Sequence, residues 1–217
     1  MDDTWFNKVR EKYSAQMQCG KGCTACCHGL FEISLADAAE VAKGFSELPP
    51  QVQREVHSRG AHLHARIRSI TTDLPEPTLV GEDDPLIDRI VNALDNPPCP
   101  FLGNAGECLI YEHRPLSCRL EGVPMVDVRD GLFGDWCELN FKEGVPEGAV
   151  KDLEQDYDAI GAADDMRSDD VARRAGLSDL RAVTFIPSVI VECCSAANCA
   201  DYANSLRNLR NSRQNRR

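Results

Sequence analysis

Long apolar runs are absent from this sequence. The longest candidate, "FIPSVIV" at residues 185–191, is far shorter than the roughly 20 residues that a membrane-spanning helix needs. Residues 1–16 are charged throughout and lack the apolar stretch of a secretory signal. We therefore expect a protein without a membrane span that is located in the cytoplasm.

The sequence also lacks the motifs of several common enzyme classes. It contains no P-loop, no dinucleotide-binding glycine motif and no recognisable order of Ser, His and Asp for hydrolysis. The net charge is -11, and the last part of the chain, residues 207–217, is the exception because it holds arginines and no acid. An acidic body of this kind is unlike a nucleic-acid-binding domain, so no nucleic-acid partner is expected.

Cysteine, in contrast, is abundant. The chain has 11 cysteines, an odd number, and the expected compartment keeps thiols reduced, so a disulfide framework explains them poorly. The stretch "CGKGCTACC" at residues 19–27 is rich in cysteine and glycine, and a second group of cysteines begins at residue 99. Short spacings supply several ligands from one loop, and distant cysteines close the site. The pattern predicts a thiolate metal site built from two remote parts of the chain.

The adjacent pair Cys26 and Cys27 leaves the kind of metal open. Neighbouring side chains diverge, so either one of the two is a spare thiol or the pair reaches two metal atoms. The C-x2-C spacing of Cys23 and Cys26 is typical of zinc sites. Closely spaced cysteines with a remote partner, and the "CP" at Cys99 and Pro100, are typical of iron–sulfur sites. An iron–sulfur cluster is the first choice and zinc the alternative.

Hydrophobic periodicity predicts a mainly α fold with a small β-hairpin, organised as one irregular metal-centred domain. The hairpin is expected at 123–137, and the apolar stretch 183–194 could be strand or helix. We expect a cysteine-cluster domain over 1–145 with a helical insert at 34–95, a C-terminal helical extension over 146–206 and a flexible basic tail over 207–217. Helices are predicted over 4–17, 34–48, 51–71, 84–95, 149–166 and 168–182.

Two motifs together resemble a known family. "CGKGCTACC" and the later "PCPFLGNAGECLIYEHRPLSCR" are similar to the YkgJ-type cysteine-cluster proteins, whose hallmark is CxxxCxxCC followed by CPFL, C-x-IY, RP and CR elements. The resemblance covers residues 19–137 and implies chelation of zinc or iron. It implies as ligands Cys19, Cys23, Cys26, Cys27, Cys99, Cys108 and Cys118, and Cys137 is added because it lies within reach in sequence.

The same resemblance supports two arginine positions near the cysteines and leaves the activity open. Arg114 and Arg119 are expected to lie around the thiolates, where they neutralise charge and donate to sulfur. The three cysteines of "CCSAANC", Cys193, Cys194 and Cys199, could be further ligands or idle thiols. We expect an iron–sulfur redox or electron-transfer accessory protein that acts with a protein partner. The alternatives are a zinc-binding structural or metal-handling interaction protein and, as the third choice, an enzyme that uses the metal centre or a reactive cysteine, since the flagellin lysine methylase shares this kind of motif.

Overall fold

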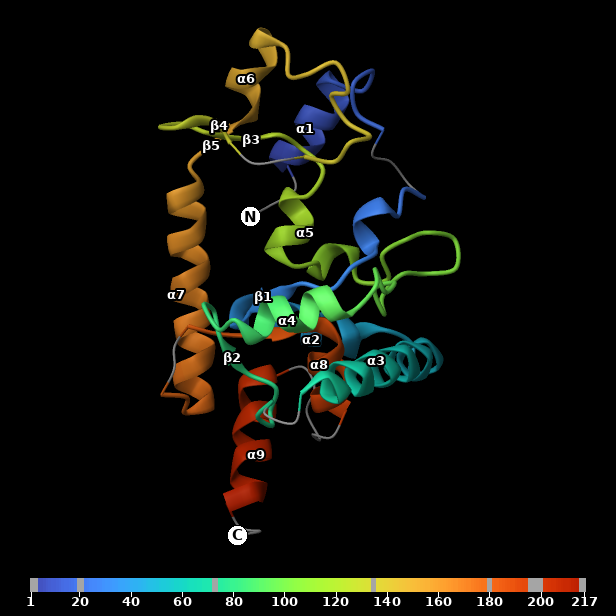
Figure 1. Ribbon diagram of the computed structural model, residues 1–217, viewed down its shortest axis with the longest axis vertical. Helices are drawn as coiled ribbons and strands as arrows, with labels where there is room; N and C mark the ends of the chain where they lie inside the picture. The colour runs from blue at the N-terminus through green and yellow to red at the C-terminus, as the bar shows by residue number, and fades with distance from the viewer. Residues whose placement is uncertain are drawn as a thin grey trace.

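The computed structural model describes residues 4–18, 22–71, 74–133, 136–178, 181–194 and 201–214. Helices dominate these residues, and the strands are short, so the predicted mainly α fold with a small β element is confirmed. Figure 1 shows two stacked parts, with α1, α6 and β3–β5 above and the other long helices below. The long helix α7 runs alongside the lower part.

The helices follow one another along the whole chain. Ser34 begins α2 by accepting a hydrogen bond on its side-chain oxygen from the Asp37 N–H, and Gly176 ends α7 in the left-handed conformation that glycine adopts at low cost. The α-helices are α1 (Thr4–Lys12), α2 (Leu35–Glu47), α3 (Pro50–Ile70), α4 (Leu86–Ala93), α5 (Leu116–Leu120), α6 (Glu147–Leu153), α7 (Tyr157–Ala175), α8 (Ile186–Cys194) and α9 (Tyr202–Gln214), and the short 3-10 helices are η1 (Ala25–Cys27) and η2 (Tyr111–His113).

The first sheet joins remote parts of the chain. Its order is β1 (Glu32–Ser34), β6 (Ala182–Phe185) and β2 (Val80–Gly81), and both neighbours run antiparallel to the central strand β6. All residues of β6 are buried. A strand from the last quarter of the chain therefore lies between two strands from the first half, so the fold is completed only by long-range pairing.

The second sheet contains the predicted hairpin. β3 (Met125–Asp127) pairs antiparallel with β4 (Gly131–Phe133), and Gly131 adopts a positive φ of 77° at the turn. β5 (Glu154–Gln155) adds a parallel third strand on β3. This sheet lies at the upper end of Figure 1, beside α1 and α6.

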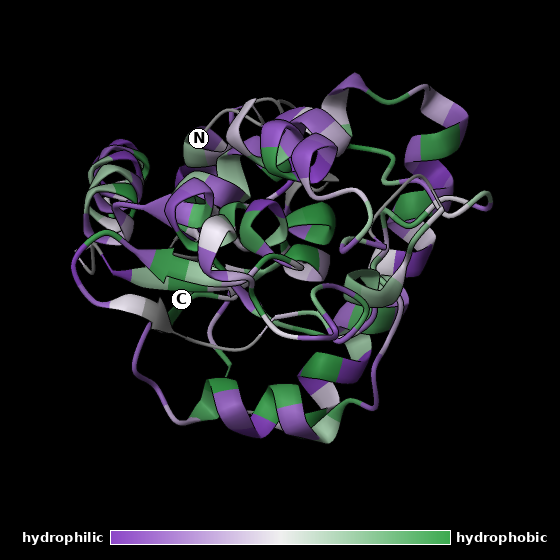
Figure 2. Cartoon of the chain, turned by 90° about the horizontal axis from the view of Figure 1, so that it is seen from above, coloured by the Kyte–Doolittle hydropathy of each residue, from purple (hydrophilic) through white to green (hydrophobic). Residues whose placement is uncertain are grey.

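The largest apolar core lies among α2, α3, α7, α8 and α9. Leu35, Val41, Val189 and Ile190 are fully buried there. Gly60 lets α3 approach α8 closely, because a Cβ placed on it would lie 3.0 Å from Ile190. Figure 2 shows hydrophobic residues gathered where the strands and helices meet at the centre. We call α2, α3, α8 and the sheet β1–β6–β2 the helical body.

In the C-terminal half, the structure corrects one sequence prediction and decides another that the sequence leaves open. The predicted helices over 149–166 and 168–182 are divided differently: α6 ends at Leu153, and α7 continues through residue 167 until Gly176. Nothing between residues 164 and 170 can stop a helix, whereas Gly176 can. The ambiguous stretch 183–194 is strand and then helix, because β6 ends at Phe185 and Pro187 stands in the first turn of α8, where proline is tolerated.

The first helix is shorter than predicted. The expected helix over 4–17 ends at Lys12, and the next turn closes through the Gln16 N–H, which donates to the Tyr13 carbonyl at 2.9 Å. In the described part of the chain, no helix combines the length and apolarity needed to cross a bilayer.

Candidate metal centre

Two segments that carry cysteine are joined directly by their backbones. We call residues 22–30 the first cysteine loop and residues 97–120 the second cysteine loop. The Cys99 N–H donates to the Cys27 carbonyl at 2.8 Å, and the Gly29 N–H donates to the Pro97 carbonyl at 2.9 Å. Figure 1 shows these segments, blue and green, side by side at the edge of the helical body. The long gap in sequence is thus closed by a short antiparallel pairing.

Glycine permits a second close contact between the two loops. Gly106 has a φ of 79°, which L side chains rarely adopt. A Cβ placed on Gly106 would lie 3.2 Å from the Cα atom of Gly22 and from the Cγ2 atom of Thr24. Gly106 is therefore the residue that lets the tip of the second loop reach the start of the first.

The second loop repeats one local arrangement at two cysteines. The Phe101 N–H donates to the sulfur of Cys99, and the Ile110 N–H donates to the sulfur of Cys108, in each case from two residues further along the chain. The two turns pair with each other, since the Leu109 N–H donates to the Phe101 carbonyl at 2.9 Å. Backbone donors of this kind favour the thiolate form, which is the form that binds metals.

Five sulfur atoms lie close enough for the charge of one to act on another. They belong to Cys26, Cys27, Cys99, Cys108 and Cys118. Burial raises the pKa of Cys99 to about 11 and also raises the pKa of Cys108. Burial, followed by repulsion from three neighbouring thiolates, raises the pKa of Cys118, which α5 carries. A bound cation would reverse this repulsion, because it stabilises the deprotonated sulfurs.

The adjacent Cys26 and Cys27 side chains interact directly, and the interaction shifts their pKa values in opposite directions. The Cys26 thiol donates a hydrogen bond to the sulfur of Cys27, which raises the pKa of Cys26 and lowers that of Cys27. Burial and the nearby Glu121 carboxylate raise the pKa of Cys26 further. The adjacent pair therefore belongs to the same group of sulfurs, with Cys26 the more exposed of the two.

Two arginines, Arg59 and Arg114, act on this group with positive charge. Arg114 lies 4.0 Å above the Tyr111 ring, and its charge lowers the pKa of Cys108 against the larger effect of burial. Arg119 donates to the Arg114 carbonyl at 3.1 Å and to the Glu112 carbonyl at 2.7 Å. Arg59, from α3, donates to the Leu102 carbonyl at 2.8 Å, and its charge favours the thiolate of Cys99.

The donor set fits a thiophilic metal such as zinc or iron. The cysteines whose side chains are described are free thiols. Among the described residues, no three Cys, His, Asp or Glu side chains are already arranged as a set of ligands around one point. What the fold supplies is a group of thiols, backbone donors to two of them and two arginines whose charges act on them, which is the chemistry that a soft metal requires.

The other candidate ligands are not among these five sulfurs. Cys137 lies on the segment that packs with α1 and α6, and its carbonyl accepts a hydrogen bond from the Asn140 N–H at 2.8 Å. The side chain of Asn140 in turn accepts from the Gln18 N–H at 2.8 Å, which ties this segment to the residue before Cys19. Cys23 precedes η1 and is half-buried. Cys19 and Cys199, and the side chains of Cys193 and Cys194, lie outside the described part of the structure.

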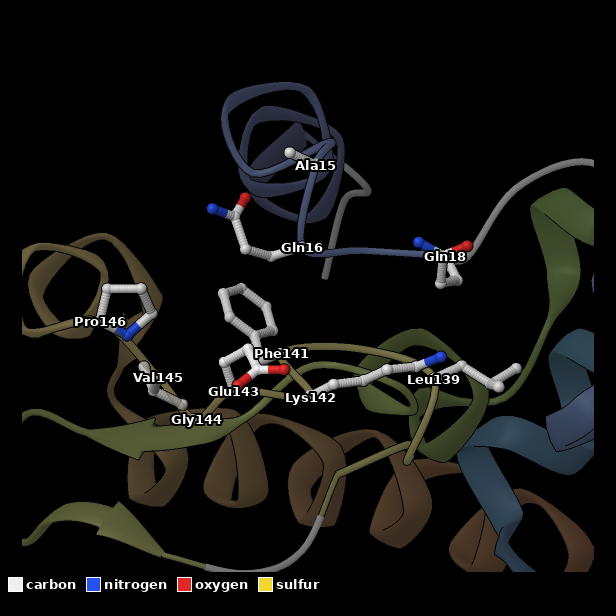
Figure 3. Close-up of a pocket in the computed structure, with 10 residues that line it drawn as sticks. All are labelled: Ala15, Gln16, Gln18, Leu139, Phe141, Lys142, Glu143, Gly144, Val145 and Pro146. Carbon is white, nitrogen blue, oxygen red and sulfur yellow. The ribbon is translucent and has the colours of Figure 1, made fainter.

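A pocket of about 430 Å3 lies next to the Cys137 segment. Figure 3 shows Gln16 and Gln18 on one side of this pocket and Phe141, Lys142 and Glu143 on the other. None of the described residues that line it is a cysteine. The pocket lining therefore includes none of the five sulfurs.

The fold and the cysteine loops together define a helical protein with a cysteine-rich chelating domain. Residues 18–138 match the model of the CxxCxxCC family, described as "Putative zinc- or iron-chelating domain". The match covers more than half of the chain, so the protein belongs to this family. No curated protein and no solved structure matches the chain.

Sequence patterns missed two charged residues beside the sulfurs. Arg59 lies in α3 and Asp37 in α2, both inside the predicted helical insert and outside the cysteine motifs. Asp37 has the spacing of a helix cap relative to Ser34, and nothing in that pattern points to a cysteine 81 positions later. Only the folded chain brings these helices against the second cysteine loop.

Proposed function

We propose that this protein holds a metal centre on the thiolates of Cys26, Cys27, Cys99, Cys108 and Cys118, and that this centre is an iron–sulfur cluster used in redox or electron-transfer work with a protein partner in the cytoplasm. The observation that carries the proposal is the convergence of sulfurs from two remote loops. A single tetrahedral ion takes at most four of these five thiolates, whereas a polynuclear centre accommodates a larger set.

The surrounding chain suits a centre of high negative charge. Arg59 and Arg114 act on the sulfurs, and the backbone N–H groups of Phe101 and Ile110 donate to them. Such donors and charges tune the reduction potential of iron–sulfur clusters. When bound, the cluster supplies one-electron chemistry, and the partly exposed Cys26 side of the group is where an electron would leave or enter.

Zinc is the second candidate, because the family is described as chelating either metal. A zinc ion would use four of the thiolates and hold the two cysteine loops together. In that case the centre would stabilise a surface for a partner, and the fifth thiol would remain unbound.

Anaerobic purification followed by metal and acid-labile sulfide analysis tests the proposal. We expect brown protein with iron and sulfide in comparable amounts. A colourless protein with stoichiometric zinc would exclude the iron–sulfur cluster and establish the second candidate. A protein that holds neither metal after reconstitution would contradict both.

Serine variants test the ligand set. Cys99→Ser and Cys118→Ser should each lose most of the bound metal, because serine is a poor ligand for soft metals. Cys137→Ser is the matched control from the segment beside α1, and we expect it to retain metal. Equal loss in the control would mean that the assigned set is wrong.

A further inference from the structure

Asp37 is a carboxylate with an unusual partner. It is 8% exposed and stands in the first turn of α2. In a capping box, an acid at this position turns back to the N–H of the capping residue. Here both carboxylate oxygens instead accept from the Leu116 N–H, at 2.9 and 3.0 Å. The side chain therefore links α2 to a residue 79 positions away in sequence.

Leu116 is the first residue of α5, and α5 carries Cys118. The first N–H groups of a helix have no acceptor within the helix, and Pro115 has no N–H to offer. The carboxylate of Asp37 supplies the missing acceptor at this end. Because α5 is a single short turn, fixing its first N–H also fixes the direction in which Cys118 leaves the backbone.

Helix α2 also contacts an earlier part of the second cysteine loop, at His113. Glu40 and Glu47 of α2 each lie 3.0 Å from a ring nitrogen of His113. These two carboxylates are about half exposed, whereas Asp37 is buried. The helix thus offers a buried contact next to Cys118 and a solvent-facing contact further from it.

The charge of Asp37 works against the thiolate that its hydrogen bond positions. A negative carboxylate near the Cys118 sulfur disfavours a second negative charge there. Asp164, which pairs with Arg167 at 2.7 Å, adds to the negative charge around Asp37, and Arg119 offsets it. Any contribution of Asp37 to metal binding must therefore come from its geometry and not from its charge.

We propose that Asp37 is the positioning residue for Cys118: its carboxylate fixes the first turn of α5 so that this sulfur faces the other four. The inference rests on the proposed metal centre, and it adds a residue from outside the cysteine motifs. The geometric effect of Asp37 can be separated from the effect of its charge, since an amide of the same shape can accept the same hydrogen bond without the negative charge.

Three variants of the full chain test the inference: Asp37→Ala removes the acceptor, Asp37→Asn keeps an acceptor oxygen, and Glu47→Gln is the control on the same helix. Zn2+ serves as the probe, and its affinity is measured by competition with a chromogenic chelator under reducing conditions. We expect Asp37→Ala to weaken binding about 10- to 100-fold, as is usual when the support of a ligand is lost. Asp37→Asn and Glu47→Gln should stay within about threefold of the unmodified chain.

If the Asp37→Ala variant folds poorly without metal, a second measurement starts from the metal-loaded protein. The rate at which excess chelator removes zinc from the metal-loaded protein should rise for Asp37→Ala and stay unchanged for Asp37→Asn. If the asparagine variant loses as much affinity as the alanine variant, the carboxylate acts through its charge or as a ligand, and the inference fails. If alanine lowers only the melting temperature, Asp37 is merely structural, and the inference also fails. An unmodified chain that binds neither Zn2+ nor iron would instead contradict the proposed function.

Discussion

The cysteine loops and the helical body are stabilised in different ways. The body buries apolar side chains such as Val56, Val189 and Ile190 among long helices. The cysteine loops contain only short helices, and they are joined to each other by a few backbone hydrogen bonds and a glycine contact. The second loop is attached to the body by the buried Phe101 and Ile110 side chains and by charged side chains from α2 and α3. Burial of apolar area is the main favourable term in folding, so the body is expected to be stable by itself. The loops, in contrast, gather thiols whose deprotonated forms are unfavourable together until a cation binds.

The helical body and the cysteine loops therefore contribute differently to the site. The body provides rigid helices, and two of them, α2 and α3, present Asp37 and Arg59 to the second cysteine loop. The loops provide the sulfurs. The binding energy of such a site is also local folding energy, because metal binding and ordering of the loops occur together.

Removal of the metal should produce the largest contrast between the two regions. Treatment with a chelator and a reductant should increase amide hydrogen exchange in residues 97–120 by at least about 100-fold, because the metal–sulfur bonds that hold the loops together are then lost. Residues of α8 should change by less than about threefold. Hydrogen exchange with mass spectrometry of loaded and stripped protein measures both regions at once. Equal loss of protection in α8 would show that the body and the loops form one cooperative unit.

A core truncation should affect the body whether or not metal is present. Ile190 is fully buried and packs against Gly60, so Ile190→Ala should cost about 2–5 kcal/mol of unfolding free energy. Denaturant unfolding of loaded and stripped protein should give the same cost in both states. Met166→Ala is the control, because Met166 is 67% exposed, and it should have almost no effect. A cost for Ile190→Ala that disappears after metal removal would contradict the independence of the body.

Gly44 tests the contact between the two regions. A Cβ placed on Gly44 of α2 would lie 2.7 Å from the Cβ atom of His113 and 3.0 Å from that of Ile110. Gly44→Ala should therefore push the second cysteine loop away and cost about 2 kcal/mol, with weaker metal binding. Thermal unfolding and zinc competition measure the two effects.

Gly161→Ala is the matched control for this substitution. Gly161 lies inside α7, and a Cβ placed on it meets no atom within 4 Å. Alanine favours the helix, so this variant should gain about 0.4–1 kcal/mol and bind metal normally. A similar loss in both variants would mean that the contact with His113 is not the cause.

A pH series should show a smaller effect that is confined to the body. Burial raises the pKa of Glu192 to about 7 from its ordinary value of 4.5, although its carboxylate accepts from the Thr78 N–H at 2.6 Å. The folded chain therefore holds this proton more tightly than the unfolded chain does. Its contribution to stability is fully present below about pH 4.5 and is lost as the pH rises through about 7.

Glu192→Gln removes this titration and keeps an oxygen that can accept from Thr78. The variant should match the unmodified chain at pH 5 and exceed its unfolding free energy at pH 8, by on the order of 1 kcal/mol. Chemical unfolding at both pH values provides the measurement. Glu143→Gln, at an exposed position, should show no such dependence. A constant difference at both pH values would point to packing and not to ionisation.

Most helices could be predicted from sequence because their signals are local. The Ser34 cap and Ala-rich face of α2, and the periodic apolar positions of α3, lie within each helix. The hairpin prediction is confirmed for the same reason, since Gly131 supplies the turn. The division of α6 and α7 was wrong because acidic residues near 164–170 looked like a new helix start, although no residue there ends a helix.

The cysteine site could be predicted only in part. The spacing of the motif identifies the candidate sulfurs, because thiolate chemistry needs many of them in two groups. It does not show that the Cys27 thiol lies within reach of the charges of Cys99, Cys108 and Cys118, since that depends on the backbone pairing of Cys27 with Cys99. It also does not show Asp37 or Arg59, whose partners lie far away in sequence.

The order of residues decides the chemistry of this protein. Cysteine spacing, glycines that permit tight turns and the absence of long apolar runs are properties of the chain itself, and they identify a helical member of a metal-chelating family. Tertiary packing decides which sulfurs meet and what holds them. The strand β6 must insert between β1 and β2, and α2 must lie against α5, before Asp37 can reach Leu116. These contacts join residues that local propensity cannot link, so they exist only in the folded protein.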